Sequence, residues 1–136
     1  MTQEFSTTKN KVDLIYPELS YKIIGILYDV LNELGSGHKE NYYQKATSAA
    51  LFKSNISFKE QVYLPITFKD INIGKYFLDF LIDEKIVLEI KANDHFSRKN
   101  IGQIFSYLKA TNLKLGILAN FSGNEVKFKR ILNIRN

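Results

Sequence analysis

Cysteine is absent from this chain of 136 residues. Its absence excludes disulfide frameworks, thiolate zinc sites and cysteine nucleophiles, and it fits a reducing cytoplasm. Long apolar runs are also lacking, since the fully apolar stretches span only a few residues whereas about 20 are needed to cross a bilayer. Residues 1–10 do not show the basic-then-apolar order of a signal peptide. We therefore expect a soluble, cytoplasmic protein that does not enter a membrane.

Internal repeats, low-complexity tracts and linkers are missing as well, and the length suits one domain. The chain is 45% hydrophobic and 13% aromatic, which is enough to bury a core and argues against disorder. We expect a loosely ordered, polar segment over residues 1–16 and a single domain over residues 17–136. The net charge of +5 and the pI near 9.3 are compatible with a polyanionic partner. Many small domains carry such a charge without one.

Three segments show the periodicity of helices. Apolar residues recur at three- and four-residue steps between Pro17, which suits a first helical turn, and Gly35, which suits a helix exit. A glycine-rich break follows over residues 35–39. Further helices are predicted at about residues 40–53 and 98–111, each with apolar side chains on one stripe.

The remaining segments are rich in β-favouring residues. Strands are predicted at residues 58–68, 71–82 and 86–91, and a short buried strand at 115–120. A last strand at 126–131 would lie on an edge. The order is helix, helix, three strands, helix, strand, with that final edge strand in addition. It predicts an α/β fold of the α+β kind, a mixed sheet with helices packed on it.

Charged side chains interrupt two strands that are otherwise continuously apolar. Because a strand alternates its faces, Asp79 is expected on one face with Phe77 and Leu81, and Glu89 on one face with Lys91. Charges on strands this apolar are costly to bury unless they are paired or hold a metal ion. These three charged residues are therefore the first candidates for a site.

The connection between the two strands decides whether the carboxylates meet. A three-residue loop over residues 83–85 would set Asp79 opposite Glu89, on the same face. A two-residue turn would set Asp79 opposite Ile90 and destroy the site. The sequence predicts the three-residue loop.

Carboxylates that meet resist joint ionisation unless a cation lies between them. Oxygen ligands favour Mg²⁺ or Mn²⁺ over zinc. The Lys91 ammonium on the same face could position an attacking water or offset charge that builds on a phosphate. The alternative is an Asp/Glu/Lys salt-bridge cluster on a solvated sheet face, and the spacing alone favours that alternative.

Asp79 followed by Glu89-Ile90-Lys91 resembles the D…ExK signature of the PD-(D/E)XK nuclease superfamily. Three further segments are similar, in family order, to the patterns of its small-protein GxxExxY branch: residues 37–43 (GHKENYY), 103–108 (QIFSYL) and 114–121 (KLGILANF). The resemblance covers about residues 19–131. Leu78 stands where the superfamily's name has proline, and many members lack that proline.

The resemblance implies a restriction-endonuclease-like core with its acidic residues on a β-hairpin. Asp79 and Glu89 would be metal ligands, and Lys91 would be the catalytic lysine. Glu40 would join the metal site directly or through water. Considered by itself, Glu40 could be a charge that the helix dipole favours at a helix start.

Two residues of the third helix would complete the catalytic set by the same resemblance. Gln103 and Tyr107 are spaced i and i+4 on one helical face and would line the pocket. The alternative for Tyr107 is an ordinary core aromatic with its hydroxyl at the rim, and Gln103 could be a surface residue.

Basic residues are candidates for contacts with phosphates, although each taken singly is better explained as a solvated surface residue. They are Lys39, Arg98, Lys99, Lys127, Lys129, Arg130 and Arg135. No recognition helix is evident, so sequence specificity is not expected from this chain alone. The domain offers little surface for a long duplex unless it forms a homodimer.

The expected function is a Mg²⁺- or Mn²⁺-dependent nuclease that acts on nucleic acid, DNA rather than RNA. Two alternatives remain open. One is a nucleic-acid-binding or regulatory module that keeps the fold without turnover, and the other is a metal-dependent phosphohydrolase that acts on a small nucleotide.

Overall fold

The computed structural model describes residues 15–134. Most of the predicted N-terminal segment and Arg135 therefore lie outside the described residues. The elements follow the predicted order, and the final edge strand is present as β5. They are α1 (Pro17–Leu34), α2 (Glu40–Lys53), β1 (Phe58–Phe68), β2 (Ile71–Ile82), β3 (Ile86–Lys91), α3 (Arg98–Thr111), β4 (Leu115–Ser122) and β5 (Glu125–Leu132).

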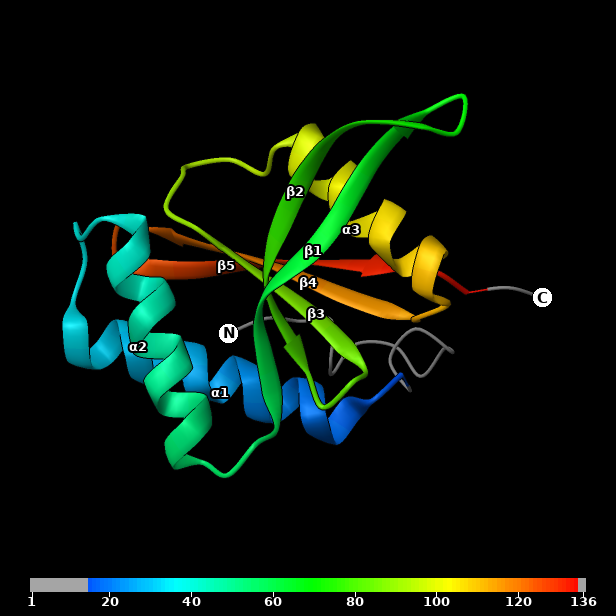
Figure 1. Ribbon diagram of the computed structural model, residues 1–136. Coiled ribbons are helices and arrows are strands. Elements are labelled where there is room, and N and C mark those ends of the chain that lie inside the picture. The colour runs from blue at the N-terminus through cyan, green and yellow to red at the C-terminus, as the bar shows by residue number, and fades with distance from the viewer. Residues whose placement is uncertain (1–14, 135–136) are drawn as a thin grey trace.

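The five strands form one sheet in the order β1-β2-β3-β4-β5 (Figure 1). All neighbours are antiparallel except β3 and β4, which are parallel. Parallel neighbours need a crossover connection, and α3 supplies it. The predicted mixed α+β architecture is confirmed. Among the described residues, no helix is long and apolar enough to span a membrane.

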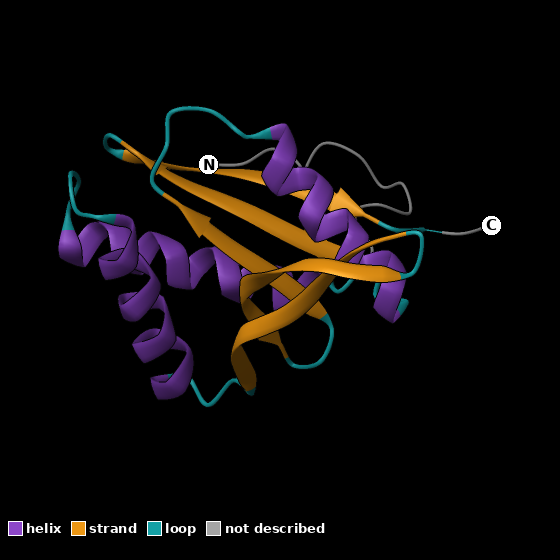
Figure 2. Ribbon diagram, turned by 45° about the horizontal axis from the view of Figure 1, so that its top comes forward, coloured by secondary structure: helices purple, strands orange, loops and turns teal. Residues whose placement is uncertain are grey.

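Helices cover both faces of the sheet (Figure 2). On one face, α1 and α2 pack against the even-numbered residues of β3, and on the other α3 packs against Val87. Every residue of β3 up to Ile90 is buried. A strand covered on both sides reads as a continuous apolar run, which is why its single buried charge, Glu89, stands out in the sequence.

Gly116 of β4 lies where α3 comes closest to the sheet. An added Cβ would overlap the branched methyl group of Ile104, whose side chain has little rotational freedom. We expect Gly116→Ala to destabilise the fold by about 1–3 kcal/mol, measured by urea unfolding. In the control Gly25→Ala, the new Cβ meets open space on the exposed side of α1. That change should stabilise by about 0.5–1 kcal/mol. An unchanged midpoint for Gly116→Ala would contradict this packing.

The β1–β2 hairpin extends beyond the rest of the sheet. β2 pairs with β3 only over Phe80–Ile82, although its pairing with β1 continues to the hairpin tip. We call residues 62–77 the arm. Figure 1 shows the arm in green, rising away from the other strands. Lys69 and Asp70 form its tip with positive φ angles of 48° and 67°, as the hairpin turn that suits the strand twist requires.

Candidate active site

A fork opens between β2 and β3 just beyond the turn that joins them. Ile82 lies opposite Ile86, so the connection has the predicted three residues. Regular pairing ends at Phe80 and Leu88. Continuing this register would place Asp79 opposite Glu89, at the point where β2 leaves the sheet to form the arm.

Two carboxylates bridge this fork. The main-chain N–H of Asp79 donates to Glu89 Oε1 at 2.8 Å, and that of Ile90 donates to Asp79 Oδ2 at 2.7 Å. The carboxylates thus accept from N–H groups that the sheet ladder no longer pairs. Asp79 is only 7% exposed and Glu89 only 2%. Their proximity, which the loop length predicted, is present in the structure.

The strand alternation expected around Asp79 is only partly correct. Leu78 and Leu81 pack on the same face, beside α3, whereas Phe80 packs on the opposite face. Strict alternation therefore fails between Leu78 and Phe80. Opposite this segment on β1, Gln61 has a φ of 53°, and it is not paired in the register of the two strands. The irregularity inserts no extra residue, because the register is the same on both sides of it.

Two residues that the sequence did not single out hold the carboxylates. The Tyr76 hydroxyl donates to Glu89 Oε2 at 2.6 Å. The Gln44 amide nitrogen donates to both oxygens of Asp79, at 3.2 and 3.3 Å, and to Glu40 Oε2 at 3.3 Å. Gln44 could have been found, because it follows Glu40 by one helical turn.

Lys91 lies at the more exposed edge of the fork. Its Nζ is 3.7 Å from Glu40 Oε2 and 3.8 Å from Glu89 Oε2, and its side chain is 21% exposed. Glu40 begins α2, and its other oxygen accepts from the main-chain N–H of Ala92 at 3.4 Å. The structure thus brings together Glu40, Asp79, Glu89 and Lys91. When all are ionised, three carboxylates face one ammonium, which leaves two negative charges in excess.

Burial dominates the electrostatics of the fork. It raises the pKa of Asp79 to about 7, and the charge of Glu89 adds to the effect. Burial also raises the pKa of Glu89, against the opposing hydrogen bond from Tyr76. The pKa of Tyr76 is raised in turn by its own burial and by that hydrogen bond. Tyr76 therefore stays protonated and remains a donor to Glu89.

A raised pKa for Asp79 predicts how metal-free stability depends on pH. Its ordinary value is 3.8, so the folded state binds the proton more tightly than the unfolded chain does. Folding free energy is then lost as the pH rises from about 4 to about 7. We expect Asp79→Asn to raise the Tm by about 5 °C at about pH 8 with EDTA, and the gain to vanish near pH 4.

The control for this experiment is Asp83→Asn in the β2–β3 turn. The Asp83 side chain is 48% exposed, so its substitution should change the Tm little. A lower Tm for Asp79→Asn at the higher pH would show that the Asp79 charge stabilises the fold and would contradict this electrostatic account.

Within residues 15–134, neither Gln103 nor Tyr107 is hydrogen-bonded through its side chain to the carboxylates of the fork. Gln103 lines a separate groove of about 540 Å³ between α3 and β1. Tyr107 packs against the core beside α3, with Lys59 and Glu84 as its charged neighbours. α3 starts near the Lys91 end of β3 and runs back toward the β2–β3 turn, and each further residue lies about 1.5 Å closer to that turn.

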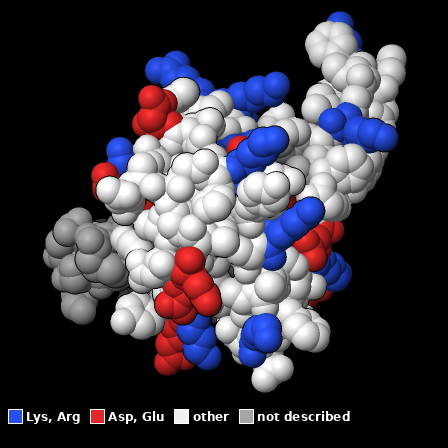
Figure 3. All heavy atoms as spheres, turned by 90° about the vertical axis from the view of Figure 1, so that its left-hand side faces the viewer, with Lys and Arg blue, Asp and Glu red and all other residues white. Residues whose placement is uncertain are grey.

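The basic residues do not gather around the carboxylates as one group. Arg98 and Lys99 line the same groove as Gln103. Lys39 precedes Glu40 and is exposed. The others lie on the edge strand β5: Lys127, Lys129 and Arg130. On the face that Figure 3 shows, basic side chains are interspersed with acidic and uncharged ones.

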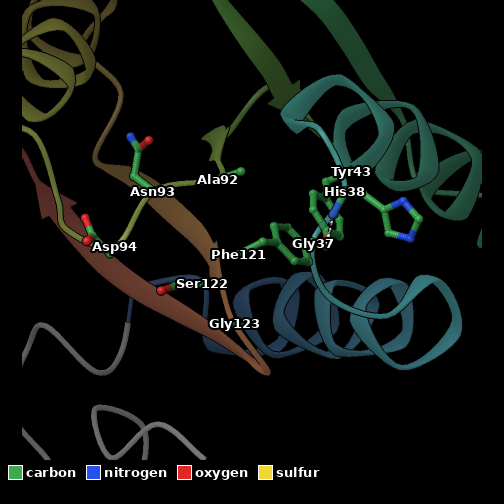
Figure 4. A pocket seen from close by; sticks show the side chains of 9 residues that line it. All are labelled: Gly37, His38, Tyr43, Ala92, Asn93, Asp94, Phe121, Ser122 and Gly123. Carbon is green, nitrogen blue, oxygen red and sulfur yellow. Dashed lines mark hydrogen bonds between the residues drawn. The ribbon is translucent and has the colours of Figure 1, made fainter.

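A cleft of about 470 Å³ borders the fork where Ala92 leaves β3 (Figure 4). Its floor is a stacked pair, Tyr43 of α2 and Phe121 of β4, with ring centroids 4.2 Å apart. The Tyr43 hydroxyl donates to the Gly35 carbonyl at 2.7 Å and accepts from the main-chain N–H of His38 at 3.3 Å. Tyr43 thus holds the α1–α2 loop and sets the start of α2, from which Glu40 reaches Lys91.

The chemistry of the fork suits a hard divalent cation. Its donors are carboxylate oxygens, and its excess of negative charge matches such an ion. As the structure stands, no three acidic or histidine side chains in residues 15–134 are gathered closely enough to hold a metal ion. The Gln44 amide nitrogen instead bridges Glu40 and Asp79.

We compared the chain with protein families, with curated sequences and with solved structures. A model of the PD-(D/E)XK nuclease superfamily matches residues 17–131. No curated protein sequence matches significantly. Among solved structures, the crystal structure of SSO0001 is similar with a TM-score of 0.54 and 16% identity, over 98% of this chain and 73% of that one. The crystal structure of an alkaline exonuclease (LHK-Exo) from Laribacter hongkongensis has a TM-score of 0.49 and 11% identity, over 94% of this chain and 73% of that one.

The family match and the mixed sheet confirm the predicted restriction-endonuclease-like fold. At such low identity, the likeness to SSO0001 shows the fold alone. The narrower GxxExxY branch stays a prediction. The chain belongs to the PD-(D/E)XK nuclease superfamily.

Proposed function

We propose that this protein is a Mg²⁺- or Mn²⁺-dependent nuclease that hydrolyses phosphodiester bonds in nucleic acid, DNA rather than RNA. The observation that carries the proposal is the meeting of Asp79 and Glu89, both buried, at the fork between β2 and β3. Burying two carboxylates together costs folding free energy. A metal-binding role explains why the chain keeps them, and members of this superfamily typically use divalent metal ions.

The proposed roles follow from the contacts at the fork. Asp79 and Glu89 would hold the metal ion, and Glu40 would join them from α2. A bound divalent ion lowers the pKa of a bound water and polarises a phosphate. The Tyr76 hydroxyl orients Glu89 and stays protonated.

Lys91 lies at the exposed edge, where its ammonium is placed to hold the attacking water or to offset charge on the phosphate. We further assign the chain to the GxxExxY branch on residues 37–43. In that segment Glu40 contacts Lys91, and Tyr43 holds the loop that precedes α2.

A second candidate is a nucleic-acid-binding module without turnover. The contact that favours it is the Gln44 amide, which donates to Glu40 and Asp79 between the proposed ligands. For the nuclease to bind its metal ion, this amide must move aside or reorient. The two candidates therefore differ in whether the fork opens to a cation.

The test is an assay of the wild-type protein on single-stranded, duplex and branched DNA and on RNA. Each substrate is incubated with Mg²⁺, with Mn²⁺ and with EDTA. We expect metal-dependent cleavage of DNA that EDTA abolishes. Binding without cleavage under every condition would favour the second candidate. Cleavage that persists in EDTA would contradict a metal-dependent mechanism.

A further inference from the structure

The arm presents two large aromatic side chains to solvent. Tyr63 of β1 is 49% exposed and Phe77 of β2 is 41% exposed. They lie directly opposite each other across the strand pair, with ring centroids 5.8 Å apart and planes tilted by 57°. Contiguous exposed apolar side chains are a feature of interaction sites.

Positive charge accompanies these rings. Lys75 lies over the Phe77 ring, with Nζ 5.8 Å from its centroid. Nearer the tip, Lys69 lies over the exposed ring of Phe68 at 5.5 Å. The arm carries a single carboxylate, Asp70, at the tip. Exposed rings with adjacent ammonium groups suit a ligand that combines flat π-systems with phosphates.

The aromatic pair lies close to the fork. Phe77 precedes Asp79 by two residues on the same strand, a separation of about 7 Å along it. Tyr76 and Leu78 pack beside α3, so Phe77 points to the other side of β2. Asp79 accepts from Gln44 of α2, which packs on that other side. A nucleic-acid strand that passes over the rings would thus reach the carboxylates within about two nucleotides.

We propose that Tyr63 and Phe77 form a stacking platform for unpaired bases, which guides single-stranded nucleic acid into the fork. This proposal rests on the proposed function, because it presumes a nucleic-acid ligand. The bases of a duplex are already stacked on one another and cannot lie flat on these rings. The platform therefore selects single strands, or the unpaired ends of duplexes, over intact duplex.

A fluorescence titration tests stacking directly, because the chain contains no tryptophan. In Phe77→Trp the new indole is the sole such reporter. We expect an oligothymidylate of about 16 nucleotides to quench its emission, and a duplex of equal length to leave it unchanged. Measurements in EDTA prevent cleavage. A titration without quenching would overturn the proposal.

The chain offers a matched control in Phe105 on α3. This ring is 38% exposed and carries Lys109 over it at 5.6 Å, so it reproduces the Phe77 arrangement away from the arm. Phe105→Trp should show no quenching by the oligothymidylate. Equal quenching at Phe105 and Phe77 would show that contact is unspecific and would refute the platform.

Affinity gives a second readout. We expect Tyr63→Ala and Phe77→Ala each to raise the Kd for the oligothymidylate at least about fivefold, whereas Phe105→Ala should not. Wild type that binds but never cleaves with metal would refute the nuclease and leave the platform standing. Cleavage by wild type together with unchanged Kd values in the arm variants would refute the platform alone.

The competing occupant of the arm is a second copy of the chain, since β1 is an edge strand. Sedimentation of wild type and Phe77→Ala distinguishes the two. We expect the same oligomeric state for both proteins. A dimer that Phe77→Ala converts to monomer without changing oligonucleotide affinity would identify a homodimer interface and overturn the proposal.

Discussion

Replacing Lys91 with alanine should lower the rate of metal-dependent cleavage by about 100-fold or more. The Lys91 ammonium is the cation at the fork, 3.7 Å from Glu40 and 3.8 Å from Glu89, at the edge that solvent reaches. Without it, the charge that builds on the phosphate has no compensating ammonium. The measurement is single-turnover cleavage at saturating Mn²⁺, which separates the chemical step from binding.

Lys85→Ala is the matched control for this experiment. Lys85 lies at the other end of β3, where it pairs with Asp83 at 3.1 Å on the surface. Its removal should leave the cleavage rate within about twofold of wild type. Lys91→Ala must also keep its fold and its Mn²⁺ binding. A wild-type rate in Lys91→Ala would refute the role assigned to this lysine.

Replacing Glu89 with glutamine should abolish the stabilisation that Mn²⁺ gives to the fold. An ion at 100 times its Kd stabilises the native state by about 2.7 kcal/mol, which corresponds to a Tm rise of about 10 °C for a chain of this size. Glu89 is almost fully buried, so the bound ion would lose a ligand that no other carboxylate in the fork can replace. We expect a Tm rise below about 2 °C in the variant.

Thermal melts with and without Mn²⁺ measure this effect independently of activity. Asp83→Asn serves again as the exposed carboxylate control and should keep the full Mn²⁺ response. Asp79→Asn should combine two results, a higher Tm in EDTA and no response to the ion. If Mn²⁺ stabilised Glu89→Gln as strongly as wild type, Glu89 would not be a metal ligand.

The elements that position the site are predictable because their causes are local. The periodicity of apolar residues sets the helices and strands, and a three-residue loop sets the register of β2 against β3. From these features alone Asp79 and Glu89 are expected to meet. Strand alternation also predicts that the even-numbered residues of β3 pack on one face of the sheet and Val87 on the other, because β3 is a regular strand between two neighbours.

Other features of the fork depend on contacts between distant segments. The alternation of β2 fails between Leu78 and Phe80, opposite the positive φ of Gln61 on β1. Tyr76 packs beside α3 and donates to Glu89, a contact that the pattern of β2 alone does not predict. Gln44 comes from a helix 35 residues earlier in the chain than Asp79.

Sequence by itself determined the order of elements, the superfamily signature and the proximity of Asp79 to Glu89. Each follows from side-chain periodicity and loop length, which act over a few residues. Only the tertiary structure decided that Gln103 lines a groove beside β1, that Tyr107 lies near Lys59 and Glu84, and that the rings of the arm face solvent. The direction of α3 and the point where β2 leaves the sheet decide these positions. Both depend on how whole elements pack, because no short segment carries that information.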